Sequence, residues 1–258
     1  MQLNRYEIRT SHAVSDLRMA VVADLHDHDR ARVKVLRLLE KERPDMILIP
    51  GDLTEELTAA PNGRGRVGLQ LLKEAAAMAP TFYSFGNHEV GARHANIWRA
   101  ALYHLPPMTV HPDYLEQIRE TGATLLDNTY TTFRGMAIGG QNTGLWDPKR
   151  VPDYGWVQDF ATQNKGFKLL LCHHPEYFDR YLRDYDIDLF VSGHAHGGQW
   201  RIFGRGVYAP DQFLFPKYTS GLHEGRLVIS RGTSNDSTCI PRFFNPCEVV
   251  VIHVKGNG

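Results

Sequence analysis

Short apolar runs, each followed within two residues by aspartate, asparagine or histidine, recur five times and constrain the fold of this chain most. The first of them, Leu17–Ala23, is rich in valine. Runs of this length and composition favour buried β-strands. In α/β proteins, side chains that follow such strands meet at one edge of the sheet, where ligand sites lie. The five strand-end motifs are Asp24-Leu25-His26, Gly51-Asp52, Gly86-Asn87-His88-Glu89, His173-His174-Pro175 and Gly193-His194-Ala195-His196.

The segments between the runs of the first half carry a helical period. In Ala31–Glu42 the apolar residues recur at spacings of four, three and one, which is typical of an amphipathic helix. We expect Asp29 to cap this helix, and Val67–Ala79 to form the next one. Helices between successive strands make those strands parallel neighbours in one sheet.

The rest of the chain again mixes helices and strands, and the glycine-separated strands after residue 197 predict a mostly antiparallel finish. We therefore predict an α/β fold in which two mixed β-sheets pack face to face and are flanked by helices. This four-layer αββα sandwich would form a single domain over residues 1–258. The remaining predicted helices are Ile97–His104, Tyr114–Glu120, Tyr154–Thr162 and Glu176–Asp184, and the remaining strands are Met46–Pro50, Thr81–Phe85, Thr124–Leu126, Thr129–Phe133, Met136–Gly139, Phe167–Cys172, Leu189–Ser192, Gln199–Phe203, Leu227–Arg231 and Glu248–Val254.

The composition argues against several classes of protein. Lysine plus arginine equals aspartate plus glutamate, 29 each, so there is no strong nucleic-acid signal. Three cysteines without C-x-x-C spacing indicate neither a disulfide framework nor a structural zinc site. Residues 1–16 have the polarity of neither a signal peptide nor an anchor, and no run reaches the ~18 apolar residues of a membrane span. We expect a cytoplasmic protein without a transmembrane segment. The sequence does not specify how many subunits it assembles into.

Histidine is the abundant residue that matters, with 13 in 258 residues. A single Asp-x-His or Gly-Asp element is commonly a cap or a turn, but five such elements at strand ends together favour a metal centre. Hydrolysis of a phosphoester needs charge neutralisation and an activated water, and two divalent ions about 3.5–4 Å apart supply both. Mixed nitrogen and oxygen ligands suit Mn, Fe, Zn or Ni better than Ca.

The order of motifs D-x-H, G-D, G-N-H-E, H-x-P and G-H-A-H, from Leu17 to about His196, resembles the calcineurin-like metallophosphoesterase family. The resemblance implies two divalent transition-metal ions, with Mn favoured, and a metal-bridging hydroxide as the nucleophile. His88 would face the leaving group as general acid, and the family places its ligand at His173 rather than His174. The implied ligands are Asp24, His26 and His196 for the first ion, Asn87, His173 and His194 for the second, and Asp52 as the bridge.

The sequence also favours one branch of the family. Protein Ser/Thr phosphatases carry G-D-x-x-D-R-G, whereas Gly51–Leu57 lacks that arginine. The stretch Gly193–Tyr208, with Ser230-Arg231-Gly232, resembles the bacterial phosphodiesterases that include UDP-diacylglucosamine pyrophosphohydrolase-like enzymes. The resemblance implies a small-molecule phosphoester as substrate.

Some residues keep two interpretations. Glu89 either orients a metal ligand or is a helix-start acid, and Arg201 either grips phosphate or forms a surface ion pair. His174 is expected beside the substrate or a ligand, and Asp27 in a solvated loop. The aromatic residues after His196 have two equally weighted interpretations: they line a wall of the substrate site, or they pack in the interior. The alternative functions are a metal-binding interaction scaffold with weak turnover and a nuclease of the same fold.

Overall fold

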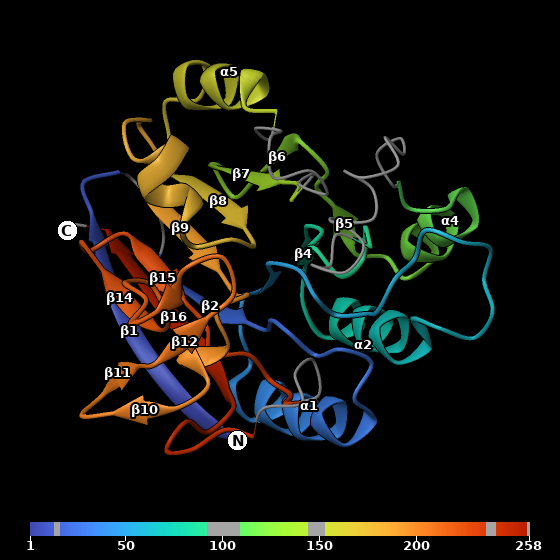
Figure 1. The fold of residues 1–258 in the computed structure, drawn as a ribbon. Helices are drawn as coiled ribbons and strands as arrows, with labels where there is room; N and C mark the ends of the chain where they lie inside the picture. The colour runs from blue at the N-terminus through green and yellow to red at the C-terminus, as the bar shows by residue number, and fades with distance from the viewer. Residues whose placement is uncertain (13–15, 92–108, 144–152, 236–240, 257–258) are drawn as a thin grey trace, which may run out of the picture.

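The computed structural model describes residues 1–12, 16–91, 109–143, 153–235 and 241–256. The predicted helix Ile97–His104 lies outside these residues. Two six-stranded mixed sheets dominate the fold (Figure 1). The first has the order β1 (Gln2–Thr10), β16 (Glu248–Gly256), β2 (Leu17–Val21), β3 (Met46–Ile49), β4 (Thr81–Tyr83) and β5 (Thr124–Leu125).

In the first sheet, β2 to β5 are parallel, as the alternation of strands and helices predicts. The helices α1 (Asp29–Glu42), α2 (Arg66–Met78) and α4 (Pro112–Glu120) connect them. All four residues of β3 are buried, because helices cover one face of the sheet and the second sheet covers the other.

The second sheet has the order β14 (Gly221–His223), β15 (Leu227–Ile229), β9 (Leu189–Ser192), β8 (Lys168–Cys172), β7 (Met136–Gln141) and β6 (Thr129–Phe133). β7, β8, β9 and β15 are parallel, and the two edge strands are antiparallel. Outside this sheet lie α5 (Gly155–Gln163) and the π-helical turn Phe178–Leu182. The other elements are the 3₁₀ turn His196–Gly198 and the hairpins β10 (Arg201–Ile202) with β11 (Arg205–Gly206) and β12 (Tyr208–Ala209) with β13 (Phe213–Leu214).

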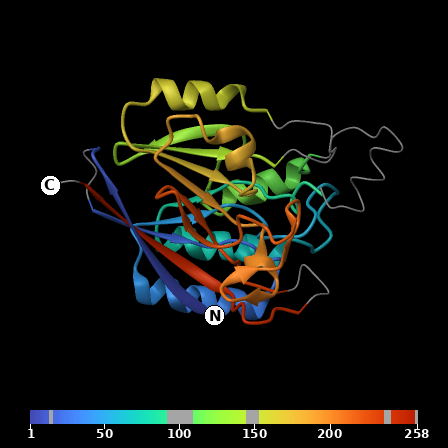
Figure 2. The ribbon, with the colours of Figure 1, turned by 60° about the vertical axis from the view of Figure 1, so that its left-hand side comes forward.

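Three apolar clusters define four layers. One joins α1, α2 and α4 to the first sheet, a second fills the space between the sheets, and a third joins α5 to the second sheet. Figure 2 shows α1 and α5 on opposite sides with the strands between them. The predicted αββα arrangement is therefore confirmed.

Several local predictions were wrong. The cap of α1 is His28, whose side chain accepts a hydrogen bond from the Ala31 N–H, and Asp29 is already helical. The predicted strand Gln199–Phe203 shrinks to β10, and the predicted helix Glu176–Asp184 to a single π-helical turn. The mostly antiparallel finish is confirmed, because β11 pairs antiparallel with β10, β13 with β12, β15 with β14 and β16 with β2. Two pairings in this part are parallel, that of β15 with β9 and that of β16 with β1.

The N-terminal strand β1 was not predicted, although Arg5, Glu7 and Arg9 alternate with more buried residues along it. No helix within the described ranges combines the length and the apolar character that crossing a bilayer requires.

Candidate metal centre

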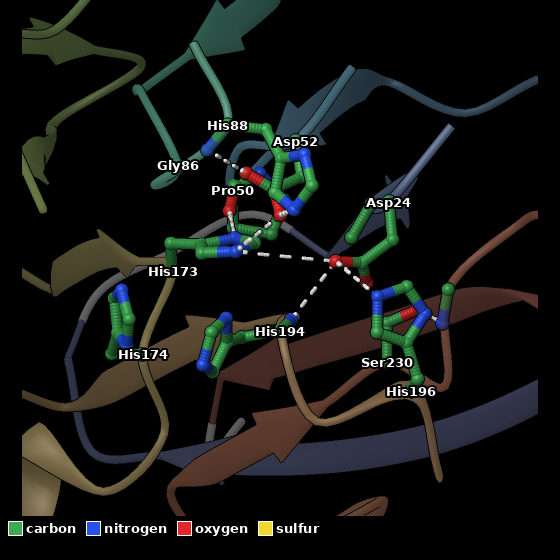
Figure 3. Close-up of polar contacts among 12 residues, drawn as sticks. Asp24, Pro50, Asp52, Gly86, His88, His173, His174, His194, His196 and Ser230 are labelled. Carbon is green, nitrogen blue, oxygen red and sulfur yellow. Dashed lines mark hydrogen bonds and ion pairs between the residues drawn. The ribbon is translucent and has the colours of Figure 1, made fainter. Parts of the chain in front are cut away.

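The predicted ligands lie in the loops that follow five strands, and the two sheets bring these loops together. The loops after β2, β3 and β4 come from neighbours in the first sheet, and those after β8 and β9 from neighbours in the second. Figure 3 shows His173, His194 and His196 arranged around Asp24. The Asp24 carboxylate accepts a hydrogen bond from the His194 N–H at 3.0 Å, and it lies about 4 Å from the Nε2 atoms of His173 and His196.

Ligand atoms gather in overlapping groups within this arrangement. In each of three groups the candidate nitrogen and oxygen atoms lie within 4.8 Å of one another. Asn87 is buried in the loop after β4, between Gly86 and His88. The three groups are Asp24 with His26 and His196, Asp52 with His173 and His194, and His26 with Asp52 and His88.

The backbone that carries these side chains is unusual. Five of the seven predicted ligands have a positive φ, a region that residues other than glycine rarely adopt. Such conformations cluster at functional sites, where surrounding contacts hold them in place. The five values are 52° for Asp24, 50° for His26, 53° for Asp52, 66° for His194 and 46° for His196.

Glu89 holds two of the ligand loops together. Its fully buried carboxylate accepts hydrogen bonds from the N–H groups of Asp52, Leu53, Thr54 and Gly86 at 2.7–3.1 Å. It lies in a turn, so the interpretation as a helix-start acid was wrong. Its contacts connect the Asp52 loop to the loop that carries Asn87 and His88.

Asp27 has a similar role, which sequence reasoning missed. Its carboxylate accepts hydrogen bonds from the N–H groups of Glu55, Gly65 and Gly68 at 3.0–3.2 Å. The expected solvated loop is therefore wrong, because Asp27 fastens the segment between β3 and α2 to the first motif.

Close approach of two loops requires glycine at Gly51. Its φ is +95°, and a Cβ there would lie 2.5 Å from the Gly86 nitrogen and 2.9 Å from the Nδ1 of His173. The His173 Nδ1 in turn lies 2.7 Å from the Pro50 carbonyl oxygen. Glycine at Gly51 thus lets the loops of both sheets meet.

The buried charges shift one another's protonation. Burial alone would raise the pKa of Asp52, but His173, His88 and His26 surround it and hold that pKa well below its usual range. Burial alone would lower the pKa of His173, but Asp52 and Asp24 raise it to about 10. Burial, with His88 nearby, lowers the pKa of His26 to about 4, so this imidazole is neutral at pH 7.

These residues fit divalent cations. Buried polar atoms almost always have hydrogen-bond partners, yet Oδ2 of Asp24 and Nε2 of His26 have none among the described residues. Both residues belong to the first group of candidate ligands. The imidazole nitrogens and carboxylate oxygens that gather there are ligands typical of Mn, Fe, Zn or Ni.

His88 lies at the rim of this cluster, with 15% of its side chain exposed. Its Nδ1 lies 3.1 Å from one oxygen of Glu55, and the other oxygen of Glu55 lies 3.3 Å from Nδ1 of His26. The Nε2 of His88 faces Asp52 at 3.9 Å. Sequence reasoning missed Glu55, although its place three residues after Asp52 could have indicated it.

A second carboxylate missed from the sequence contacts His194. Oδ2 of Asp211 lies 2.9 Å from Nε2 of His194. His174 lies beside the ring of His194, with 4.0 Å between the centroids, and its Nδ1 lies 2.9 Å from Glu176. These four residues form another group of potential ligand atoms. Neither Asp211 nor Glu176 belongs to a strand-end motif.

Arg201 and the aromatic residues after His196 do not line the centre in the expected way. The Arg201 guanidinium donates hydrogen bonds to the carbonyl oxygens of Gly197 and Gly204, so it braces the β10–β11 hairpin. Arg242, which the sequence did not indicate, lies 2.9 Å from Nδ1 of His196. Tyr218 is buried, whereas Trp200 and several phenylalanines are exposed.

The chain is similar in sequence to known metallophosphoesterases. The sequence model of the calcineurin-like phosphoesterase family matches residues 17–198. An uncharacterized metallophosphoesterase of Campylobacter jejuni is 24% identical over 99% of this chain and 63% of its own length. The phosphodiesterase YaeI of Escherichia coli is 27% identical over 76% of this chain and 65% of its own length.

The chain spans less than two thirds of the first of these relatives and about half of others. A bovine transmembrane protein with a metallophosphoesterase domain is 26% identical over 82% of this chain and 46% of its own length. Among solved structures, TT1561 of Thermus thermophilus superposes with a TM-score of 0.47 at 14% identity, over 69% of this chain and 82% of its own.

Proposed function

The chain belongs to the calcineurin-like phosphoesterase family, and from this premise we propose that it hydrolyses phosphoesters with two bound divalent ions. The observation that carries the proposal is the convergence of carboxylate and imidazole ligand atoms from both sheets. Asp24, His26 and His196 would hold the first ion, and Asn87, His173 and His194 would hold the second. Asp52, whose carboxylate is grouped with His26 as well as with His173 and His194, would contribute to both.

When bound, the two ions neutralise the charge of the phosphate oxygens and lower the pKa of a water that attacks phosphorus. Mn²⁺ is the ion we favour, because it accepts the mixture of imidazole nitrogen and carboxylate oxygen present here. Glu89 keeps the Asp52 and Asn87 loops in register through its four backbone contacts. Asp52 is ionised throughout the neutral range, as its lowered pKa requires.

His88 is the proposed proton donor. Its Nδ1 is engaged with Glu55, so Nε2 is the nitrogen that faces the centre and the oxygen of the leaving group. A side chain that stands at the rim of the centre, partly exposed, can reach a substrate that enters from solvent. Positioned proton donors of this kind contribute roughly 10²–10⁴-fold to rate.

The proposed substrate is a small-molecule phosphoester, and a diester is the first choice because a relative is named a phosphodiesterase. Gly51–Leu57 lacks the arginine of the protein Ser/Thr phosphatases, which argues against phosphoproteins. A nuclease and a scaffold without turnover are the alternatives that the experiment below separates.

The test compares wild-type protein, His88→Asn and the control His253→Asn, all loaded with Mn²⁺. His253 is a suitable control because it lies on β16, outside the strand-end motifs. We expect wild type and control to hydrolyse bis-p-nitrophenyl phosphate, with kcat lower by about 10²–10⁴-fold in His88→Asn. Metal content, measured on the same samples, should be equal in all three. Metal binding without hydrolysis above the His88→Asn background would identify a scaffold, and faster cleavage of plasmid DNA than of the small diester would identify a nuclease.

A further inference from the structure

The exposed hydrophobic side chains are concentrated in one region. Of the nine large hydrophobic residues that are exposed in the described part of the chain, eight lie in residues 200–215 and 243–244. We call these eight side chains the aromatic patch; five are phenylalanine and one is Trp200. The most exposed are Phe203 at 102%, Phe244 at 89% and Phe215 at 77%. Concentrated exposed apolar surface of this kind marks an interaction site.

The segments that carry the patch lie side by side, as their backbone hydrogen bonds show. The Val207 N–H donates to the Trp200 carbonyl at 2.9 Å, and the Phe215 N–H donates to the Val207 carbonyl at 2.8 Å. The Arg201 N–H donates to the Phe243 carbonyl at 3.0 Å. Figure 1 shows the β10–β11 hairpin of this region projecting from the body of the molecule. The segments that carry the patch are therefore neighbours in space.

The backbone holds several of these rings outward under strain. Phe203, Phe213, Phe215 and Phe244 all have φ between 49° and 57°, a region that is costly for a bulky residue. An exposed phenylalanine contributes no hydrophobic free energy to the folded monomer that could offset the cost of its strained backbone. Such conformations persist where a function requires them.

The patch is tied directly to the metal-ligand loops. Asp211 and Arg242, which lie within the same segments, contact His194 and His196 at 2.9 Å. The Asn245 side chain also donates to the His196 carbonyl at 2.7 Å. A surface that binds the patch will therefore lie beside the metal centre.

The charge of the region differs from that of the whole chain. Residues 199–218 and 241–247 contain the four basic residues Arg201, Arg205, Lys217 and Arg242, against one acidic residue, Asp211, which faces His194. The chain as a whole has zero formal charge. Lys217 forms an ion pair with Asp179, and Arg201 and Arg242 contact the Gly197 carbonyl and His196. Arg205 is exposed on the β10–β11 hairpin beside the aromatic rings, and this pairing of a basic with apolar side chains matches a surface that is anionic outside and apolar beneath.

We propose that the aromatic patch docks the protein on the surface of an anionic phospholipid bilayer and holds the metal-ligand loops beside the lipid headgroups. The most exposed rings stand at separate loop tips, and lipid can receive separate side chains without a complementary rigid surface. A second protein would need such a surface, about 800 Å² on each partner. The inference goes beyond hydrolysis and does not depend on it, since docking requires no turnover.

The experiment measures co-sedimentation of the protein with two kinds of vesicle: phosphatidylcholine containing 30 mol % phosphatidylglycerol, and phosphatidylcholine alone. The salt concentration is roughly 0.1 M, at which electrostatic attraction to the vesicle surface is only partly screened. The variants are Phe203→Ser/Phe215→Ser/Phe244→Ser and Arg205→Glu. Met78→Ser is the control, because Met78 is a large exposed hydrophobic residue that lies outside the patch. We expect the partition coefficient to fall at least tenfold in the triple variant, to fall less in Arg205→Glu, and to stay unchanged in Met78→Ser. Omitting phosphatidylglycerol should also weaken binding.

A second measurement needs no change to the phenylalanines. Brominated lipid should quench the tryptophan fluorescence of the wild-type protein, and this quenching should be lost in Trp200→Phe. Equal binding of wild type and triple variant, or no binding of wild type to either vesicle, would overturn the proposal. A wild-type dimer that the triple variant converts to monomer, without vesicle binding, would overturn it in favour of an interface between copies. Hydrolysis of a soluble diester, measured in parallel, reports separately on the proposed function.

Discussion

At the scale of single residues, carboxylates outside the strand-end motifs decide how the histidines point. Glu55 contacts both His26 and His88, and Asp211 contacts His194. A histidine that binds metal through one nitrogen is oriented by the partner of the other nitrogen. Removing such a partner should leave the ligands in place while making the centre less ordered.

Glu55→Gln keeps the shape of the side chain but removes the charge that two imidazoles face. We expect kcat on bis-p-nitrophenyl phosphate to fall about 10–100-fold, with little change in KM or metal content. The matched control is Glu56→Gln, whose carboxylate accepts a hydrogen bond from the hydroxyl of Thr58. Equal losses in the two variants would contradict a positioning role for Glu55.

Asp211→Asn should weaken metal binding rather than the later chemistry. The amide cannot hold the Nε2 side of His194 as a carboxylate does, so we expect the affinity for the second ion to fall roughly 10–100-fold. Titration of metal-free protein with Mn²⁺ measures this, and Asp184→Asn is the control because Asp184 is exposed on the surface. Unchanged affinity for both ions would rule out the role proposed for Asp211.

Metal binding should release a proton from His173. Its pKa is raised to about 10 by Asp52 and Asp24 against the effect of burial, so the metal-free imidazole is charged at pH 7.5. A metal ion must displace that proton, and the apparent affinity should therefore increase as the pH rises toward 10. Calorimetric titrations in buffers of different ionisation enthalpy count the protons released. Proton uptake, or an affinity that falls with rising pH, would show that His173 starts neutral.

At the scale of elements, the turns after the strands carry the centre, and crowding there limits substitution. Gly51 and Gly63 both have strongly positive φ, +95° and +88°, but nothing lies within 4 Å of a Cβ placed at Gly63. The comparison of these two glycines therefore separates backbone strain from loop contact.

Gly63→Ala should lower the free energy of unfolding by about 1–2 kcal/mol, the cost of a left-handed alanine. Gly51→Ala should cost roughly 1–3 kcal/mol more, because its Cβ would overlap the Gly86 backbone and His173. It should also reduce metal content, since the two ligand loops must separate. Chemical denaturation and metal analysis of both variants provide the measurement; equal destabilisation would show that the loops yield easily.

Elements with strong internal patterns were predictable, whereas short ones were not. α1 and β3 show clear periodicity or a continuous apolar run, and their residues are buried accordingly. β1 is an edge strand with a charged outer face, so its residues do not form an apolar run. β10 has only two residues and depends on Arg201 and on neighbouring segments for its geometry.

At the scale of the whole molecule, the interior cluster between the sheets contains residues from both of them. We propose that the chain therefore forms one domain over residues 1–258. Scanning calorimetry of metal-free protein should then give a single cooperative transition, because neither sheet can expose this shared cluster without the other. Two separate transitions would contradict the proposal.

Metal should raise the temperature of that transition. Ions that bind only the folded state at 100 times their Kd stabilise it by about 2.7 kcal/mol, which corresponds to roughly 5–10 °C in a chain of this size. Addition of a chelator should reverse the shift. A Tm that is independent of Mn²⁺ concentration would mean that the buried groups around Asp24 do not bind the ion.

The sequence by itself determined most of the strands and helices, the sandwich, and the strand-end motifs from Asp24 to His196, because periodicity and local motifs depend on residues that are close together in the chain. Only the tertiary structure revealed the contacts of Glu55, Asp211 and Arg242 with the histidines, because these partners lie up to 46 residues away along the chain. It also decided that the aromatic residues after His196 are mostly exposed. Whether an apolar side chain is covered depends on what packs above it, which no local pattern of sequence records.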